Sequence, residues 1–232
     1  MDRIKQIVSK IWRWTWIATI TFFIITIGMV VVLRFVPTPV TPLMLIRCGE
    51  QLADGRSLRL NKDWVSFSNI SPNMVQAAVA AEDSSFPEHF GFDFEAIQKA
   101  MRHNERSKKI RGASTISQQT AKNVFLWPSR SYVRKGLEVY LTFLIEVMWT
   151  KERIMEVYLN IVEMGDGVYG VEAAAQKYYH KPAAKLSRAE AAMLAAILPR
   201  PLKRYPDRPT GFLQNRQARI LRLMLKLGPV KL

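Results

Sequence analysis

The chain has 232 residues, which is enough for one sizeable domain and hardly for two. Its 34 Lys and Arg against 19 Asp and Glu give a net charge of +15, so we expect an anionic partner: nucleic acid, a membrane surface or a phosphorylated substrate. The 49% hydrophobic content excludes disorder along the whole chain. A single cysteine, Cys48, excludes an intrachain disulfide and, with only three histidines, argues against a structural zinc site.

An uncharged apolar run near the N-terminus predicts a membrane anchor. Residues 14–33 carry no charge, and a helix of 20 residues spans about 30 Å, the thickness of a bilayer's hydrocarbon core. The alternative is a cleavable signal peptide, which has a shorter apolar core and ends in small residues, whereas Arg34-Phe35-Val36-Pro37 follows here. We therefore expect a retained single-pass helix.

The charges around this run predict its orientation. The tail formed by residues 1–13 has an excess of basic residues, which favours a cytoplasmic N-terminus: Arg3, Lys5, Lys10 and Arg13 against Asp2. Residues 35–232 then lie outside the inner (cytoplasmic) membrane, which in a bacterium means the periplasm. Because little nucleic acid is found there, the remaining positive charge favours an anionic lipid surface or a lipid-linked phosphate.

The rest of the chain is predicted to be mainly α. Residues 34–70 are expected to be a membrane-proximal segment of extended chain and short strands, since Pro37, Pro39 and Pro42 oppose a helix and Asp54-Gly55 predicts a turn. Residues 71–232 are expected to form a mostly helical domain.

Several signals mark its helix starts and one loop. Ser71 before Pro72 predicts a capped helix, and two pairs fit capping boxes: Thr115 with Gln118, and Ser187 with Glu190. The polar, basic stretch 102–112 predicts a mobile loop, either a solvated linker or a flap that grips substrate.

A carboxylate occupies an apolar position in the helix after Pro72. Val75, Ala78 and Val79 form the buried stripe of that helix, and the next position of the stripe is Glu82. A carboxylate there is costly unless it is paired or lines a cleft. Acidic, aromatic and histidine residues follow within eight positions: Asp83, Phe86 and His89. The alternative is an ordinary salt-bridged helix terminus.

Two further blocks are rich in polar and charged side chains. Residues 114–123 can present a donor-rich helical face to a sugar or an anion, although a polar surface helix is the alternative: Ser114, Thr115, Gln118, Gln119, Lys122 and Asn123. Arg134 and Lys135, followed by Glu138, supply paired cations for a diphosphate, although ordinary salt bridges explain them equally well. The large apolar residues of 124–149 indicate core packing or partial burial in the bilayer.

These blocks, and two later ones, resemble the five motifs of the family 51 glycosyltransferases, the peptidoglycan glycosyltransferases or transglycosylases. The motifs appear in order over residues 70–206: Glu82-Asp83-x-x-Phe86-x-x-His89-x-Gly91; Gly112-x-Ser114-Thr115-Ile116-x-Gln118-Gln119-x-x-Lys122-Asn123; Arg134-Lys135-x-x-Glu138 with Glu146 and Lys151; Gly167-Val168-Tyr169-Gly170; and Leu186 to Tyr205-Pro206. Thr142 departs from the usual Ala. With no Ser-x-x-Lys or Lys-Thr-Gly sequence, the chain is similar to the monofunctional members that lack a transpeptidase domain.

The resemblance implies a lysozyme-like helical domain that polymerises lipid II into glycan strands by inverting transfer, forming β-1,4 bonds and releasing polyprenyl diphosphate. Glu82 would be the base and Glu138 the second catalytic carboxylate, with Asp83 orienting. The substrate would contact the following residues: Asp83, Phe86, His89, Ser114, Thr115, Gln118, Gln119, Lys122, Asn123, Arg134 and Lys135. A Mg²⁺ or Mn²⁺ ion bridging the diphosphate is implied by the resemblance alone.

The same resemblance implies partners and a cellular role, and the residues leave rivals open. Lipid II, the lipid-linked strand, membrane lipids and other cell-wall or division proteins are the expected partners, in cell-wall biogenesis and cell shape. A lysozyme-like hydrolase shares a catalytic Glu but has no need of the cations at 122, 134 and 135. A non-enzymatic membrane scaffold and a nucleic-acid binder are two more rivals, and export disfavours the nucleic-acid binder. The nine cations from Arg200 to Lys231 are assigned only a membrane-surface role.

Overall fold

The structure, a computed structural model, describes residues 2–107, 112–129 and 131–232. The chain divides into two compact units, one ending at Val36 and the other running from Pro37 to Leu232. The first unit is a single helix, and the second contains all the other described helices and strands.

Helix α1 (Asp2–Phe35) makes up the first unit. Its segment Lys5–Phe35 is long and apolar enough to cross a membrane by length and composition. Threonine hydroxyls along it donate to backbone carbonyls four residues earlier, at 2.9 Å in each case: Thr15, Thr19 and Thr26. Hydroxyls satisfied within the helix suit an apolar surrounding. The prediction of one continuous helix through residues 14–33 is confirmed.

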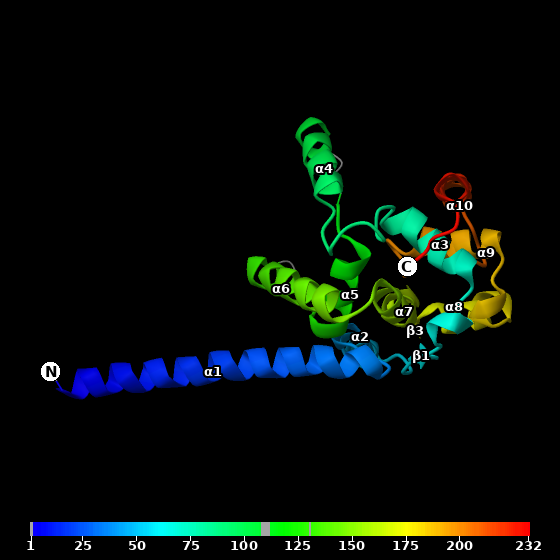
Figure 1. The fold of residues 1–232 in the computed structure, drawn as a ribbon. Helices are drawn as coiled ribbons and strands as arrows, with labels where there is room; N and C mark the ends of the chain where they lie inside the picture. Colours follow the sequence, from blue (N-terminus) through cyan, green and yellow to red (C-terminus); the bar gives the residue numbers. More distant parts are fainter. Residues whose placement is uncertain (1, 108–111, 130) are drawn as a thin grey trace. The chain divides into compact units, whose positions relative to one another are not determined.

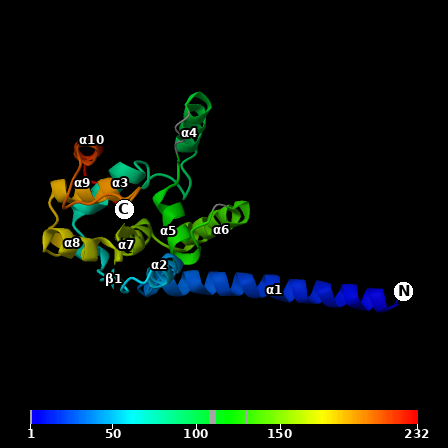
Figure 2. The same cartoon turned by 180° about the vertical axis from the view of Figure 1, so that it is seen from behind.

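Helices dominate the second unit, which confirms the mainly α prediction (Figure 1). They are α2 (Pro42–Ala53), α3 (Pro72–Glu82), α4 (Phe94–Arg106), α5 (Ile116–Phe125), α6 (Tyr132–Met148), α7 (Lys151–Ile161), α8 (Val171–Tyr179), α9 (Arg188–Ile197) and α10 (Gly211–Leu227), with the 3₁₀ turns η1 (Phe67–Asn69) and η2 (Ala183–Lys185). Helices α3, α9 and α10 pack on one another, and α5 packs against α6 and α7. In both views α4 projects away from these two groups (Figures 1 and 2).

A small three-stranded sheet joins the start of this unit to the segment after α7. Its order is β1 (Asn61–Lys62), β3 (Val168–Tyr169), β2 (Glu163–Gly165); β1 pairs parallel to β3, with Asn61 opposite Val168, and β2 pairs antiparallel to it. Gly170, directly after β3, has φ +82°, and a Cβ there would lie 2.6 Å from the Asn160 carbonyl oxygen. Only glycine fits this turn, which explains part of the fourth motif.

The prediction of extended chain and short strands for residues 34–70 is wrong over Pro42–Ala53, which form α2. Thr41 accepts a hydrogen bond from the backbone N–H of Met44, and Pro42 stands at the first helical position, where its fixed φ and missing N–H are no disadvantage. The same signal, a hydroxyl residue before proline, predicts the helix at Ser71-Pro72, where α3 does begin. The predicted turn at Asp54-Gly55 is confirmed, with Gly55 at φ +67°.

The predicted loop over residues 102–112 is wrong in its first part, because α4 continues to Arg106. Asp93 caps this helix by accepting from the N–H of Ala96 at 2.7 Å, and the Arg102 guanidinium donates to Gln98 one turn earlier. Pairs of that spacing stabilise a polar helix whose composition alone favours a loop. Residues 108–111, which this prediction also covered, lie outside the described residues.

The core is densest around α3 and α9. Residues 191–197 of α9 are all buried, as are residues 74–80 of α3. Glu82 is the residue at which α3 ends, so its backbone is held by a buried helix that packs against α9 and α10. The core therefore fixes the position of this carboxylate.

Candidate active site

Glu82 lies at a cleft of about 1060 Å³. The walls come from the end of α3, from residues 112–115 and Gln119, and from residues 199–223. The Glu82 side chain is 14% exposed, so it is largely desolvated yet open to the cleft. This is where the stripe of apolar residues in α3 predicted a core-side carboxylate.

A chain of side chains from two other helices orients Glu82. Gln119 Nε2 donates to Glu82 Oε2 at 3.1 Å, and the Tyr158 hydroxyl makes a long contact of 3.5 Å with Gln119 Oε1. Burial, and next the Glu82 and Asp83 charges, raise the pKa of Tyr158 well above its usual value, so this hydroxyl keeps its proton and can donate. The Gln119 amide is thereby turned with its NH₂ toward Glu82.

The surroundings of Glu82 favour the protonated form more than water does. Burial is the largest influence and raises the pKa of Glu82; the Gln119 hydrogen bond, Arg216 and Lys122 oppose it, while Asp83 adds to it. A carboxylate with a raised pKa is a stronger base than a surface glutamate. This direction agrees with the prediction from its core-side position.

Asp83 ties the first motif to the start of α5. Its side chain is buried, accepts from the backbone N–H of Ile116 at 2.9 Å and faces His89 Nε2 at 3.0 Å. An ionised carboxylate only accepts, so this pairing places a proton on Nε2. Asp83 also lines the cleft. Its contacts are those of a residue that positions the backbone beside Glu82, which fits the orienting role.

Phe86 and His89 are not among the residues that line the cleft. Phe86 is fully buried, with the Lys151 ammonium 4.6 Å from its ring centre, and the His89 side chain is 10% exposed. Both residues contact other residues of the motifs, since Phe86 packs against Lys151 and His89 faces Asp83. Substrate contact by either one stays a prediction.

The polar side chains predicted to form one face over residues 114–123 do not share one environment, because some are buried and others line the cleft. Thr115 and Gln118 are buried in the capping box of α5, and the Thr115 hydroxyl donates to the Gly91 carbonyl at 2.7 Å. Ser114 is exposed, and it lines the cleft with Thr115 and Gln119. Gln118 is not among the lining residues, because its amide oxygen accepts from the Thr115 N–H inside the cap.

A second buried carboxylate, Glu138, lies within α6 between two cations. Arg134 Nη1 is 2.6 Å from Glu138 Oε2 and Lys135 Nζ is 2.5 Å from Oε1, so each oxygen has its own partner. Arg134 also donates from Nε to the Ser129 carbonyl at 2.7 Å, which fixes the guanidinium plane. Glu138 is 3% exposed, whereas the Lys135 side chain is 45% exposed and can reach a ligand.

The half-buried Lys122 of α5 is under the electrostatic influence of both carboxylates. Burial lowers the pKa of this lysine, Glu138 and more weakly Glu82 oppose that effect, and Arg134 and Lys135 reinforce it. Three cations therefore surround Glu138, and one of them also acts on Glu82. Asn123, the next residue of α5, is half-buried. A net positive cluster of this kind suits a diphosphate.

The residues near Glu138 do not form a metal cage. Among the described residues no group of three or more His, Cys, Asp or Glu side chains could hold an ion. Both oxygens of Glu138 already face Arg134 and Lys135. Protein ligands for Mg²⁺ or Mn²⁺ are carboxylates and carbonyls rather than ammonium groups, so this donor set does not fit.

A buried ionic network holds the first three motifs together. Glu146 of α6 is bonded by the Ser117 hydroxyl and by Lys151 Nζ at 2.8 Å, and Lys151 also donates to the His89 carbonyl at 2.6 Å. Thr142 donates its hydroxyl to the Glu138 carbonyl at 2.6 Å. The network explains why residues far from the chemistry belong to the motifs.

Gly91 provides a test of this packing. Its φ is +77°, and a Cβ there would lie 3.0 Å from both Glu146 Cγ and Thr142 Cγ2. Gly91→Ala should lower the free energy of unfolding by about 1–3 kcal/mol, measured by urea denaturation. Gly49→Ala in α2, where a Cβ meets nothing within 4 Å, is the matched control and should be neutral or slightly stabilising. An unchanged midpoint for Gly91→Ala would contradict the close packing.

The cleft wall formed by residues 199–223 carries cations that the sequence did not lead us to place there. Five of the nine basic residues between Arg200 and Lys231 line it: Arg200, Lys203, Arg204, Arg216 and Arg219. Arg216 Nη2 comes within 3.7 Å of Glu82 Oε1. Their assignment to a membrane surface alone is therefore wrong. The spacing of Arg216 and Arg219 on one helix face was the available signal.

The helical fold and the cationic cleft around a desolvated carboxylate are those of an enzyme that handles an anionic substrate. A family model described as Transglycosylase matches residues 49–225, and the chain belongs to this family. Proteins named biosynthetic peptidoglycan transglycosylase are similar along nearly all of it. That of Bacteroides thetaiotaomicron is 55% identical over 94% of this chain and 88% of the relative, and that of Bdellovibrio bacteriovorus is 52% identical over 90% and 84%.

The same holds for the protein of that name from Escherichia coli, which is 55% identical over 87% of this chain and 84% of the relative. The resemblance seen in the five motifs is thereby confirmed, and with it the prediction that the chain is a transglycosylase.

Proposed function

We propose that this chain polymerises lipid II into linear glycan strands of peptidoglycan and has no transpeptidase activity. The observation that carries the proposal is the desolvated Glu82 on a large cationic cleft. A second buried carboxylate, Glu138, holds Arg134 and Lys135. The relatives' name supports peptidoglycan as the product. The cations favour a diphosphate-linked donor over the neutral glycan that a lysozyme-like hydrolase would cut.

The proposed reaction is a single displacement with inversion. Glu82 takes the proton of the acceptor's 4-hydroxyl, and that oxygen attacks the anomeric carbon of the growing strand. The bond from this carbon to the diphosphate oxygen breaks, and the polyprenyl diphosphate leaves with the electron pair. Arg134 and Lys135 neutralise the charge that develops on it. Glu138 holds both cations in place, so its catalytic role is exerted through them.

Several residues support these steps without taking part in proton transfer. Gln119 holds the Glu82 carboxylate and Asp83 fixes the start of α5. Ser114 and Thr115 on the cleft wall are positioned to contact sugar hydroxyls. Lys122 adds positive charge between the two halves of the site. The divalent ion stays a prediction, and the displacement described here uses only groups of the chain.

The direct test is incubation of the full-length protein with labelled lipid II in detergent. Polymer that a muramidase digests into disaccharide units is the expected product, and its anomeric configuration reports inversion. Fragments without polymer would instead support the hydrolase, and absence of any turnover would support the membrane scaffold. Loss of function in cells carrying Glu82→Gln separates the enzyme from the scaffold independently.

We further propose that α1 anchors the enzyme in the bacterial inner membrane with its N-terminus in the cytoplasm and the second unit in the periplasm. Its apolar length and the basic residues of the tail support this topology. Lipid II, the lipid-linked strand and membrane lipids are then within reach. Other cell-wall or division proteins are further proposed partners.

Deleting residues 1–36 tests the anchor. The remaining residues form a compact unit of their own, so the truncated protein should keep polymerase activity in detergent and lose its retention in membranes. Sedimentation of the two purified forms with liposomes of bacterial lipids measures the second effect. Full pelleting of the truncated chain would show that α1 is not the sole attachment.

A further inference from the structure

The ion pair between Arg216 and Glu82 is incomplete on the arginine side. The distance from Arg216 Nη2 to Glu82 Oε1 is 3.7 Å, longer than a hydrogen bond. Arg216 Nε is buried and has no hydrogen-bond partner among the described residues. A buried guanidinium donor without a partner is costly, so the side chain has unused capacity for an anion.

The helices that carry the two residues are held in register. Gln76 of α3 donates its amide to the Met224 and Gly228 carbonyls at the end of α10, at 2.8 and 2.5 Å. Helix α10 therefore cannot slide along α3 without breaking buried hydrogen bonds. The Arg216 guanidinium is confined to the cleft, and movement is left to its side-chain torsions.

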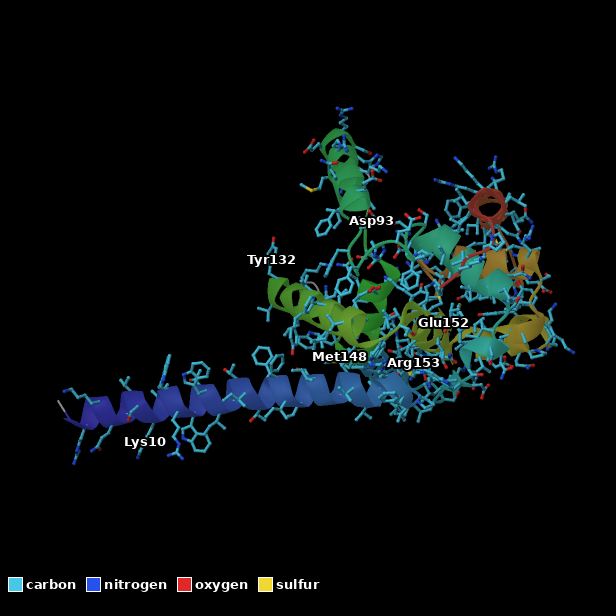
Figure 3. The ribbon with its side chains drawn as sticks, in the orientation of Figure 1. Lys10, Asp93, Tyr132, Met148, Glu152 and Arg153 are labelled. Atoms are coloured by element: carbon cyan, nitrogen blue, oxygen red, sulfur yellow. The ribbon has the colours of Figure 1, made fainter. Side chains whose placement is uncertain are left out.

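The remaining described carboxylates on the cleft wall are already engaged. Asp83 is bonded to Ile116 and His89, and Asp93, at the base of α4 in Figure 3, is bonded to Ser85 and to the cap of α4. Glu82 is thus the carboxylate available to the cations of this wall. Burial lowers the pKa of Arg204, the like charges of Arg216 and Arg200 lower it further, and Glu82 opposes them.

A crowded group of cations facing one carboxylate is arranged to receive a second anion. We propose that Arg216 is a positioning residue that pairs with Glu82 in the free enzyme and moves to an anionic group of the substrate when the cleft is filled. The inference rests on the proposed function, since the anion would be a phosphate group of the lipid-linked sugar. A diphosphate outcompetes a single carboxylate because it carries more charge and more acceptor oxygens.

The exchange would change the basicity of Glu82 at the moment of binding. The groups that face Glu82 from the surrounding elements are Asp83, Lys122, Tyr158, Arg204 and Arg216. Arg216 and Lys122 lower the pKa of Glu82, and Asp83 raises it. When the Arg216 charge turns away, the pKa of Glu82 rises. The free enzyme keeps its base ionised, and the complex has a stronger base facing the acceptor hydroxyl.

The test measures Glu82 directly, by ¹³C NMR of glutamate-labelled full-length protein in detergent, with the signal assigned by its loss in Glu82→Gln. Saturating inorganic pyrophosphate is the probe. We expect pyrophosphate to raise the pKa of Glu82 in the unaltered protein. In Arg216→Gln the pKa should start higher and rise less. An equal rise in both proteins, or failure of pyrophosphate to bind, would overturn the proposal.

Two variants keep the result interpretable. Arg219→Gln removes a neighbouring cation from the same helix and the same cleft wall. In this variant saturating pyrophosphate should raise the pKa of Glu82 as much as in the unaltered protein, although pyrophosphate should bind more weakly. Arg216→Lys retains the positive charge and should restore the low starting pKa even where Arg216→Gln folds poorly. If Arg219→Gln matched Arg216→Gln, the effect would be general electrostatics and the specific role would be lost.

Kinetics with lipid II supply a second readout. The pH profile of kcat reports the enzyme–substrate complex, and that of kcat/KM reports the free enzyme. In the unaltered enzyme the acid limb of the kcat profile should therefore lie at higher pH than the acid limb of the kcat/KM profile. Arg216→Gln should bring the two limbs together and lower kcat/KM by about 10- to 150-fold, the usual cost of losing a hydrogen bond to a charged group. Unchanged separation would overturn the proposal. A failure to polymerise lipid II would instead overturn the proposed function and leave the NMR result standing.

Discussion

Glu82→Gln should lower the rate of lipid II polymerisation by at least about 100-fold, because the amide keeps the shape of the side chain and removes the base. The Gln119 amide, the partner of Glu82, can still donate to the new carbonyl oxygen. Binding of substrate should therefore be largely retained, and the loss should appear in kcat. Single-turnover measurement of polymer formation would separate the two.

The fold should survive this change. Burial raises the pKa of Glu82 in the folded protein, so the ionised carboxylate opposes folding at pH values above that pKa. Gln removes this cost, and the variant should be at least as stable as the parent at neutral pH. Glu95→Gln on the exposed face of α4 is the matched control and should leave the rate unchanged. Activity retained in purified Glu82→Gln would exclude Glu82 as the base.

The raised pKa of Glu82 also predicts how the polymerisation rate depends on pH. Catalysis needs the ionised carboxylate, so the rate should fall as pH drops through the raised pKa of Glu82. The acid limb should therefore lie at higher pH than for an exposed glutamate. Glu82→Gln should abolish this limb in the residual activity.

The sequence correctly predicted helix starts and buried helix faces, which depend on residues within one or two turns of each other. The apolar spacing of Val75, Ala78 and Val79 predicted that Glu82 faces the core, and Thr115 with Gln118 predicted where α5 begins. Both depend on backbone geometry within one or two turns. The three prolines after the anchor led to a wrong prediction, because so many prolines in a short segment oppose a helix. Pro42 nevertheless begins α2, because Thr41 caps the helix directly before it.

Contacts between distant segments could not be predicted in this way. Arg216 reaches Glu82 because α10 packs on α3, and nothing within either helix specifies that neighbour. Gln118 and Gln119 are adjacent and both polar, yet a helix turns successive side chains by about 100°. One therefore closes a cap and the other holds the Glu82 carboxylate. The sequence alone cannot choose between them.

Which apolar residues of α6 are buried also depends on distant segments and could not be predicted from the sequence. Core packing and bilayer burial both explained the large residues of 124–149. The structure buries Leu141, Leu144 and Ile145 but leaves others exposed, including Tyr132 at the start of α6, labelled in Figure 3. Which residues of an apolar helix are exposed depends on its neighbours, and α5 covers only one side of it.

The arginine beside Glu138 carries the second large expected effect. Arg134→Ala should lower kcat/KM by about 10²–10³-fold, the usual cost of losing one preorganised donor to developing negative charge. Arg134 is fixed at both ends of its guanidinium, by Glu138 and by the Ser129 carbonyl, and its side chain is only 12% exposed. It is therefore preorganised, whereas the Lys135 side chain has Glu138 as its one ion-pair partner among the described residues and is 45% exposed. Lys135→Ala should cost less.

The division between kcat and KM tests where Arg134 acts. If it stabilises the departing diphosphate, kcat should fall with kcat/KM, because the charge develops in the transition state. Glu138 keeps Lys135 as a partner in Arg134→Ala, so no buried carboxylate is left alone and the melting temperature should change little. Arg134→Lys retains charge but loses the planar fork, and should recover only part of the rate. Normal turnover with a normal KM in Arg134→Ala would exclude the diphosphate role and leave Glu138 as a structural ion pair.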